Sequence, residues 1–231
     1  MSIQKYKITK IKKLGSNVKV FCFEPLEGKL PEYKPGHFTF LHLFNENGES
    51  IVKRAYSIAS SPDMPYIELC IKMVNGELTG RLERIEVGGV VGIEQPGGHL
   101  TYDDQPKIAL IAGGTGISPM MSILRYITYK QMKGEFVLFY SARTRADILY
   151  REELEELQKK NENITVVITL TREEWEGEKG RLCHAVIGKY IDDTKGFNWW
   201  ICGPMEMIKT MKQCLSSLGV EAKNIKIEGW G

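Results

Sequence analysis

The four residues Arg54-Ala55-Tyr56-Ser57 combine the side chains that a phosphate and a flat ring would need. On a strand, alternate side chains share a face, so Arg54 and Tyr56 point one way and Ser57 the other. A guanidinium can hold a phosphate through two bonds, a phenol ring can lie against a planar heterocycle, and a hydroxyl can reach a ring nitrogen. An ordinary strand with a surface arginine and a packing tyrosine is the alternative.

A second cluster begins at Lys72, the end of the run Leu69-Cys70-Ile71-Lys72, and continues with Gly76-Glu77-Leu78-Thr79. Thr79 can cap a short helix over 79–85. The free amides and positive dipole of a helix N-terminus favour phosphate. Because helix-capping residues are common, this segment indicates a phosphate site only when its distance from Arg54 in the sequence is also considered. Strand, strand and capped helix would let both clusters converge on one diphosphate.

Two glycine turns follow strand-like segments in the second half of the chain. Ile108–Ala112 runs into Gly113-Gly114-Thr115-Gly116, with Pro119 in the first turn of the following helix. Glycines let a backbone approach a pyrophosphate closely, although a purely structural turn would have the same pattern. Near the end, Trp199–Ile201 runs into Cys202-Gly203-Pro204, where a thiol at a strand end would lie beside a nicotinamide ring. A buried apolar cysteine is the alternative.

The spacing of apolar residues predicts two domains with different folds. Up to about residue 100, short β-rich segments separated by turn signals favour an antiparallel sheet or small barrel, interrupted by the helix over 79–85. Its strands are expected at 6–11, 18–23, 37–43, 54–58, 67–73 and 90–94. The polar Thr101–Pro106 segment is the expected boundary, which gives one domain over 1–102 and a second over 103–231.

Beyond this boundary, apolar strands alternate with longer segments of helical period. Strands are expected at 108–112, 136–141, 164–170, 199–202 and 225–227, and helices at 118–131, 150–160 and 205–218. This rhythm predicts an α/β domain with a doubly wound parallel sheet, whose ligands bind beyond the carboxyl ends of the strands.

The composition argues against several classes of function. Thirty-one Lys and Arg against 29 Asp and Glu give a net charge of +2, too balanced for nucleic acid as the main partner. The longest apolar runs are far shorter than the roughly 20 residues of a membrane span. Five widely spaced cysteines without a CxxC pair favour reduced thiols in the cytoplasm. We therefore expect a cytoplasmic protein with no membrane span and no metal or iron-sulfur site.

In this order, and over almost the whole chain, the four clusters resemble the ferredoxin-NADP reductase superfamily: an RxYS strand, a GxxS/T helix start, a GGxGI/VxP loop and a CGP turn. The resemblance implies a flavoprotein oxidoreductase in which a hydride passes from a nicotinamide cofactor to a bound flavin. In that family the RxYS arginine contacts flavin phosphate, the tyrosine packs on the flavin ring, and the serine hydrogen-bonds near the nitrogen that receives the hydride. These roles fall on Arg54, Tyr56 and Ser57.

The same resemblance implies that 1–102 is the FAD-binding domain and that 103–231 is the NAD(P)H-binding domain, and it assigns the other clusters. Lys72 and the Gly76–Thr79 segment match the part that holds the flavin diphosphate, which favours FAD over FMN, with Thr79 standing where serine is usual. Gly113–Gly116 match the nicotinamide pyrophosphate loop, and Cys202–Pro204 match the turn beside the nicotinamide. The chemistry belongs to the cofactors, so Ser57 and Cys202 are expected to shape the contact between the two rings without forming covalent intermediates.

Many relatives end with an aromatic ring that covers the flavin face opposite the first tyrosine. Trp230 could do this here, with Glu228 as the nearby carboxylate. The Gly229 spacer and the extra Gly231 depart from the family pattern and put the stacking geometry in doubt. A disordered tail is the alternative.

Three arginines bear on the choice of nicotinamide cofactor. Arg143, Arg172 and Arg181 could surround a 2′-phosphate, since guanidinium suits phosphate. Family members that use NADPH have arginines in such places, yet some NADH-using relatives keep the first or the third. NADPH is the expected cofactor, with NADH as the alternative.

The expected function is that of a free-standing reductase that passes electrons to a small redox protein such as a ferredoxin. One alternative is an electron-transfer subunit of a larger complex, although related subunits usually carry a cysteine cluster near the C-terminus, and here only Cys202 and Cys214 fall late. Another is an NAD(P)H-dependent flavin or ferric reductase. A nucleotide-binding module without chemistry would leave Arg54, Tyr56 and Ser57 unexplained.

Overall fold

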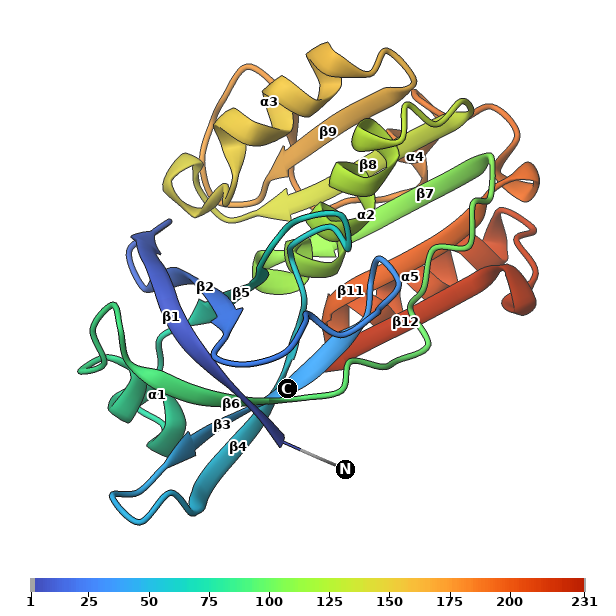
Figure 1. The fold of residues 1–231 in the computed structure, drawn as a ribbon. Helices are drawn as coiled ribbons and strands as arrows, with labels where there is room; N and C mark the ends of the chain where they lie inside the picture. The colour runs from blue at the N-terminus through green and yellow to red at the C-terminus, as the bar shows by residue number, and fades with distance from the viewer. Residues whose placement is uncertain (1–2, 231) are drawn as a thin grey trace.

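Two β-sheets, one antiparallel and one parallel, organise the protein (Figure 1). The computed structural model describes residues 3–230, except for the side chain of Trp230. The antiparallel sheet lies at the lower left of Figure 1, and the parallel sheet lies with its helices at the upper right. An antiparallel β-barrel followed by a doubly wound α/β domain is the expected fold class, and it is confirmed.

Six antiparallel strands in the order β4-β3-β6-β1-β2-β5 form the N-terminal sheet. They are β1 (Ile3–Lys13), β2 (Val18–Pro25), β3 (Phe38–Phe44), β4 (Ser50–Ser57), β5 (Ile67–Lys72) and β6 (Val90–Glu94). A bridge between Ile58, which follows β4, and Leu69 on β5 joins the two edge strands. The bridge closes the sheet into a barrel, around a core that includes the fully buried Tyr6, Ile8, Phe21 and Phe23.

Six parallel strands in the order β10-β9-β8-β7-β11-β12 form the second sheet. They are β7 (Lys107–Gly113), β8 (Glu135–Ala142), β9 (Ile164–Leu170), β10 (Glu178–Lys179), β11 (Asn198–Pro204) and β12 (Ile225–Trp230). The helices are α2 (Ile117–Tyr129), α3 (Arg151–Lys160), α4 (His184–Ile187) and α5 (Met205–Ser217), and a short α1 (Glu77–Leu82) belongs to the barrel.

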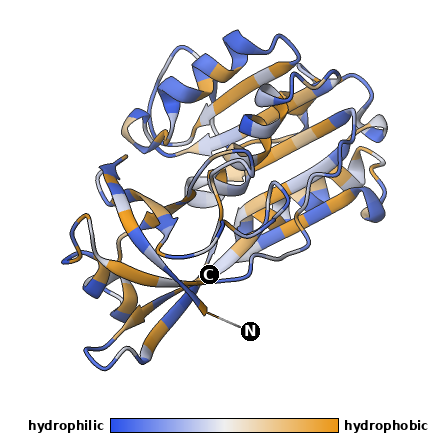
Figure 2. Ribbon diagram, in the orientation of Figure 1, coloured by the Kyte–Doolittle hydropathy of each residue, from blue (hydrophilic) through white to orange (hydrophobic). Residues whose placement is uncertain are grey.

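The central position of β7 in the sheet explains why its sequence is apolar at successive positions. Ile108 and Leu110 belong to one core cluster with α2 and α3, whereas Ala109 and Ile111 belong to another with α4 and α5. A parallel strand covered on both faces has no solvent side for polar residues. Figure 2 shows the result, with apolar orange along the inner strands and hydrophilic blue over much of the outer helix α3.

Element boundaries differ from expectation mainly at short or edge segments. Strand β4 begins at Ser50, four residues before the expected start, and β12 continues beyond residue 227 to Trp230. Neither β10 nor α4 was expected, because two residues or one helical turn leave no periodic pattern. Within residues 3–230, no helix has the length and apolar character needed to cross a bilayer.

Candidate functional site

Three side chains from three strands meet where the two domains touch. Ser57 ends β4, Cys202 lies near the end of β11, and Glu228 on β12 is in register with Cys202. The Ser57 hydroxyl donates a hydrogen bond to Oε1 of Glu228, and Sγ of Cys202 lies 4.0 Å from the same oxygen. The structure therefore brings together three of the four residues expected to be catalytic.

The fourth of these residues, Trp230, is the last residue of β12 and pairs in register with Pro204. Its backbone therefore lies beside the Cys202–Pro204 turn. The side chain lies outside the described residues, so its stacking on the flavin stays a prediction.

Burial controls the ionisation of this cluster. Burial raises the pKa of the Glu228 carboxyl above its ordinary value, and the bond from Ser57 offsets this only in part. Burial and the nearby Glu228 carboxylate hold the pKa of the Cys202 thiol well above its ordinary value. A thiol in such surroundings is neutral near pH 7 and inert as a nucleophile. This agrees with a role for Cys202 in shaping the site.

The two glycine turns pack against each other and also leave room for a ligand. A Cβ on Gly203 would lie 3.3 Å from the amide nitrogen of Gly113, and a Cβ on Gly113 would lie 2.7 Å from the sulfur of Met207. Gly114 differs, because its φ is +56° and a Cβ there would meet no atom within 4 Å. The backbone at Gly114 faces open space, which fits the approach of a pyrophosphate.

A cavity of about 410 Å³ lies between the carboxyl ends of the parallel strands and the barrel loop around residues 15–18. The expected site residues that line it are Lys72, Gly113, Gly114, Thr115, Arg143, Arg181 and Pro204. Lys72 is expected at the flavin, yet it faces the same cavity as the nicotinamide loop. Asn17 and Met207 also line the cavity. In the sequence, Asn17 is recognisable only as part of a turn and Met207 only as an apolar position of a helix, so neither is predicted to be a site residue. Doubly wound sheets bind ligands in such a place.

Arg54 and Tyr56 both lie on β4, and their shared face stays a prediction. Arg54 is exposed, and its Nη1 donates to the Lys53 carbonyl at 2.8 Å. Among the described residues it forms no ion pair, so its guanidinium is available to a phosphate. Burial raises the pKa of the half-buried Tyr56 to about 12 and keeps its phenol neutral.

The helix start near Thr79 departs from the sequence-based expectation. Helix α1 begins at Glu77, its N-cap residue is Gly76, and the cap makes no side-chain bond. The expectation that Thr79 caps the helix is wrong, because Thr79 lies inside it and its hydroxyl donates to the Val74 carbonyl. The side chains of Leu78 and Thr79 are buried, so any contact of this segment with a diphosphate must come from its backbone.

The three arginines considered for a 2′-phosphate are exposed, and within the described part of the chain none of them forms an ion pair. Arg143 and Arg181 line the 410 Å³ cavity, whereas Arg172 does not. The neighbouring Arg145 is held by carboxylates of Glu173 and Glu176, at 3.2 and 2.7 Å. Two free guanidinium groups therefore share the cavity with the Gly113–Gly116 loop.

An antiparallel barrel followed by a parallel sheet with a glycine loop at its carboxyl edge is the fold expected of flavin- and nicotinamide-dependent oxidoreductases. The oxidoreductase FAD-binding domain family matches residues 5–102, and the oxidoreductase NAD-binding domain family matches residues 110–213. Ferredoxin-NADP reductase B of Sorangium cellulosum is 31% identical over 235 residues, which cover 96% of this chain and 95% of that protein. The chain belongs to the ferredoxin-NADP reductase superfamily.

Other similarities agree with this assignment. The reductase subunit of glycine betaine monooxygenase from Chromohalobacter salexigens is 30% identical over 225 residues, covering 93% of this chain. The chain spans 61% of the length of that relative. The fold of a ferredoxin NADP+ reductase from Neisseria gonorrhoeae, solved with bound FAD and NADP, matches with a TM-score of 0.85 at 20% identity, over 99% of each chain.

The chain carries both the FAD-binding and the NAD-binding domain of this oxidoreductase superfamily. Its own residues fit both cofactors. The unpaired guanidinium of Arg54 and the half-buried ring of Tyr56 suit the phosphate and ring of a flavin. The open backbone at Gly114 suits a nicotinamide pyrophosphate.

Proposed function

We propose that the protein oxidises NADPH and passes the electrons through FAD to a small redox protein such as a ferredoxin. A bound FAD would supply the chemistry that accepts a hydride from the nicotinamide and donates electrons to an acceptor. The observation that carries the proposal is the meeting of Ser57, Cys202 and Glu228 at the carboxyl edge of the parallel sheet, next to the cavity that holds the glycine loop.

Different residues of the chain would align the flavin and the nicotinamide. Arg54 and the backbone at the start of α1 would hold the flavin phosphates, and Tyr56 would pack on the flavin ring. The Gly113–Gly116 loop would hold the nicotinamide pyrophosphate. Ser57 and Glu228 form a polar contact between the domains, and the neutral Cys202 thiol bounds the place where the two rings approach. Such a site accelerates hydride transfer through orientation and exclusion of water.

The preference for NADPH is supported by the two unpaired arginines in the cavity. A guanidinium that reaches the 2′-phosphate would contribute about 1.5 kcal/mol at an exposed site, or about tenfold in affinity. We expect Arg181→Ala to raise the Michaelis constant for NADPH about tenfold and to leave that for NADH nearly unchanged. Arg145→Ala is the matched control, because Arg145 is held by Glu173 and Glu176. A wild type that prefers NADH, with equal effects of Arg181→Ala on both cofactors, would refute the preference.

A ferredoxin-like acceptor is supported by the motifs shared with the superfamily and by the similarity to ferredoxin-NADP reductase B. The matched residues cover 95% of the length of that protein. A second candidate is an electron-transfer subunit of a larger complex. It is supported by similarity to an oxygenase reductase subunit and, at 28% identity, to the gamma subunit of sulfhydrogenase 2 from Pyrococcus furiosus. Two experiments separate these acceptors. The first compares the rates at which the protein reduces ferredoxin, free flavin and a ferric complex, and the second identifies the chains that co-purify with it.

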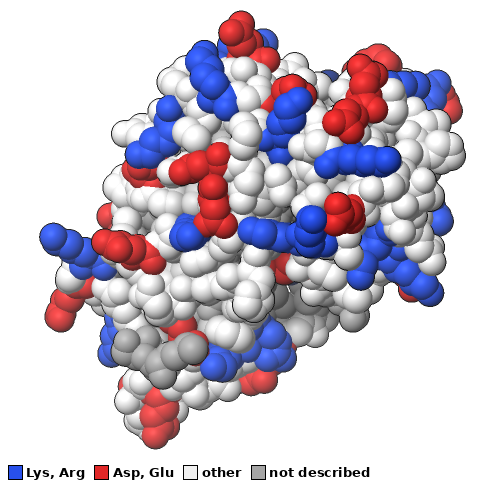
Figure 3. All heavy atoms as spheres, turned by 90° about the vertical axis from the view of Figure 1, so that its right-hand side faces the viewer, with Lys and Arg blue, Asp and Glu red and all other residues white. Residues whose placement is uncertain are grey.

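A cytoplasmic location completes the proposal. All five cysteines are free thiols, as in a reducing compartment. Figure 3 shows acidic and basic side chains interspersed over one face of the molecule, in line with the small net charge. Neither feature favours nucleic acid as a partner. Fractionation of the native host, with antibody detection of the chain in the cytosolic fraction, tests the location.

A further inference from the structure

Arg125 joins the two domains, although it lies outside every cofactor-site cluster. It sits in the middle of α2 and is 6% exposed. Its Nε and Nη2 donate to the two carboxylate oxygens of Glu153 on α3, at 2.6 and 2.8 Å. Its Nη1 donates to the Ala59 carbonyl at 2.7 Å and to Oε1 of Glu68 at 2.8 Å. Ala59 follows β4 and Glu68 lies on β5, so one guanidinium connects the helices of the second domain to the barrel.

A second residue of α2 holds the same barrel segment. The fully buried Ser122 donates from Oγ to the Ser60 carbonyl at 2.6 Å. The Ser60 hydroxyl accepts from the Glu68 amide at 3.0 Å and lies 2.9 Å from the Tyr33 hydroxyl. The Tyr150 hydroxyl donates to Oε1 of Glu68 at 2.9 Å. A buried network with its members satisfied in this way is rigid, so the segment has little freedom to move relative to α2.

The position of this network relates the two cofactor sites to each other. Helix α2 directly follows the Gly113–Gly116 loop, and residues 59 and 60 follow directly on Ser57 and Ile58. The bonds from Arg125 and Ser122 therefore tie the helix behind the nicotinamide loop to the chain behind the flavin strand. Reacting atoms must approach to about 3–3.5 Å, and a misplacement of about 1 Å can cost on the order of 100-fold in rate.

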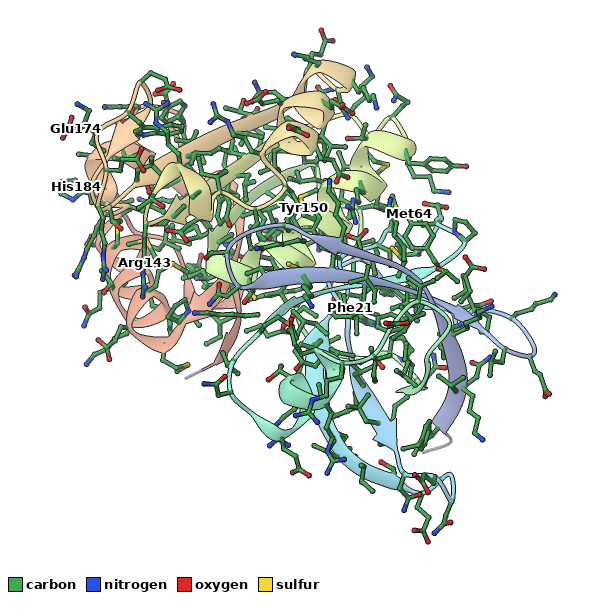
Figure 4. All side chains as sticks on the ribbon, turned by 90° about the vertical axis from the view of Figure 1, so that its left-hand side faces the viewer. Phe21, Met64, Arg143, Tyr150, Glu174 and His184 are labelled. Atoms are coloured by element: carbon green, nitrogen blue, oxygen red, sulfur yellow. The ribbon has the colours of Figure 1, made fainter. Side chains whose placement is uncertain are left out.

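We propose that Arg125, assisted by Ser122, is a positioning residue that sets the approach of the nicotinamide to the flavin. The inference rests on the hydride transfer proposed above. The network is separate from the cofactor cavity, because Arg125, Tyr150 and Glu153 line a different cavity of about 1020 Å³ between α2, α3 and the end of β1. Figure 4 shows Tyr150 at the boundary between the helices and the barrel strands, apart from Arg143. The side chains of Arg125 and Ser122 are not among the residues proposed to contact either cofactor, so substitutions there test alignment separately from those contacts.

The first test compares Arg125→Lys with Arg151→Lys in the FAD-loaded protein. Lysine keeps the positive charge but cannot make two bonds to Glu153 and also reach the barrel. Arg151 lines the same cavity, and among residues 3–230 it pairs only within the second domain, with Glu155 at 3.2 Å and Glu176 at 3.7 Å, so it is the matched control. We expect Arg125→Lys to slow hydride transfer in anaerobic stopped flow by about tenfold or more, because the rings are misaligned.

Two further readouts separate alignment from a general loss of structure. The charge-transfer absorbance between nicotinamide and flavin should weaken in Arg125→Lys, while the dissociation constant for NADPH and the FAD content change by less than about twofold. Amide hydrogen exchange at Ala59, whose N–H donates to the Glu68 carbonyl at 2.8 Å, should become faster. Arg151→Lys should match the wild type in all of these measurements.

Several outcomes would overturn the inference. A wild-type hydride-transfer rate and charge-transfer band in Arg125→Lys would do so directly. If Arg125→Lys yields no folded protein, the hydride-transfer rate of Ser122→Ala tests the inference instead. This substitution removes the hydrogen bond to the Ser60 carbonyl and leaves Arg125 in place. A slower hydride transfer at an unchanged thermal midpoint supports the inference, and a wild-type rate overturns it. A wild type without any hydride transfer would refute the proposed function, and the inference with it.

Discussion

Replacing Ser57 by alanine should destabilise the protein in a way that depends on pH. The Ser57 hydroxyl is the donor to Glu228, whose carboxyl is partly buried and has a raised pKa. A hydrogen bond to a charged group contributes about 1.5 to 3 kcal/mol, and partial exposure places this bond at the lower end, about 1.5 kcal/mol. For a chain of this size that corresponds to a fall of about 3 to 6 °C in the thermal midpoint.

The sign of the pH dependence follows from the direction of the shift. A carboxyl with a raised pKa in the folded state stabilises the fold below its unfolded pKa, and this stability is lost as pH rises through the folded pKa. Ser57→Ala removes the bond that favours the charged form, so it raises the pKa of Glu228 further. The variant should therefore lose less stability at pH 5 than at pH 8, where a larger fraction of Glu228 is charged.

The assay is thermal unfolding of the holoprotein in a fixed excess of FAD at both pH values, with the dissociation constant for FAD measured for each variant so that its contribution to stability is subtracted. The control places Ser57→Ala in a Glu228→Gln background, where no charge is left without a donor and the loss at pH 8 should fall by more than half. An equal loss at pH 5 and pH 8, or no loss at pH 8, would refute the reasoning.

Three more predictions concern the cofactor contacts. Gly203→Ala should slow hydride transfer, because the new Cβ would lie 2.4 Å from Cε of Met207 and push that side chain toward Gly113; Met207→Ala in the same chain should restore part of the rate by freeing space, and stopped flow that detects no slowing would contradict the packing. Arg54→Ala should weaken FAD binding by about tenfold or more in fluorescence titrations, and unchanged affinity would place the flavin phosphates elsewhere. Trp230→Ala should tighten nicotinamide binding about twofold to tenfold and delay its release, since stacking contributes about 0.5 to 1.5 kcal/mol; wild-type affinity and turnover would mark the tail as solvent-exposed.

Much of the fold could be predicted from the sequence because its signals are local. The apolar run at 108–112 indicated a strand covered on both faces, and the core clusters divide it accordingly. Ser57 and Cys202 could be identified from motifs at their own positions. The bond between Ser57 and Glu228 could not be, because it joins residues that are 171 positions apart and needs the barrel docked against the sheet.

Other features of the site left no usable signal. Thr79 was mistaken for a helix cap because capping residues also occur inside helices, and only the backbone shows that Gly76 precedes the first turn. Arg125 is a single charged residue in an apolar helix, and its pattern is the same as that of a surface arginine. Its carboxylate and carbonyl partners come from α3 and from the chain after β4, which no local rule brings together.

The central claim is hydride transfer from NADPH to a flavin held by this chain, and an anaerobic titration of the purified protein tests it most directly. The account predicts a yellow protein with one FAD per chain, whose flavin absorbance is bleached by about one equivalent of NADPH. A colourless protein, FMN in place of FAD, or a flavin that neither NADPH nor NADH bleaches would contradict it.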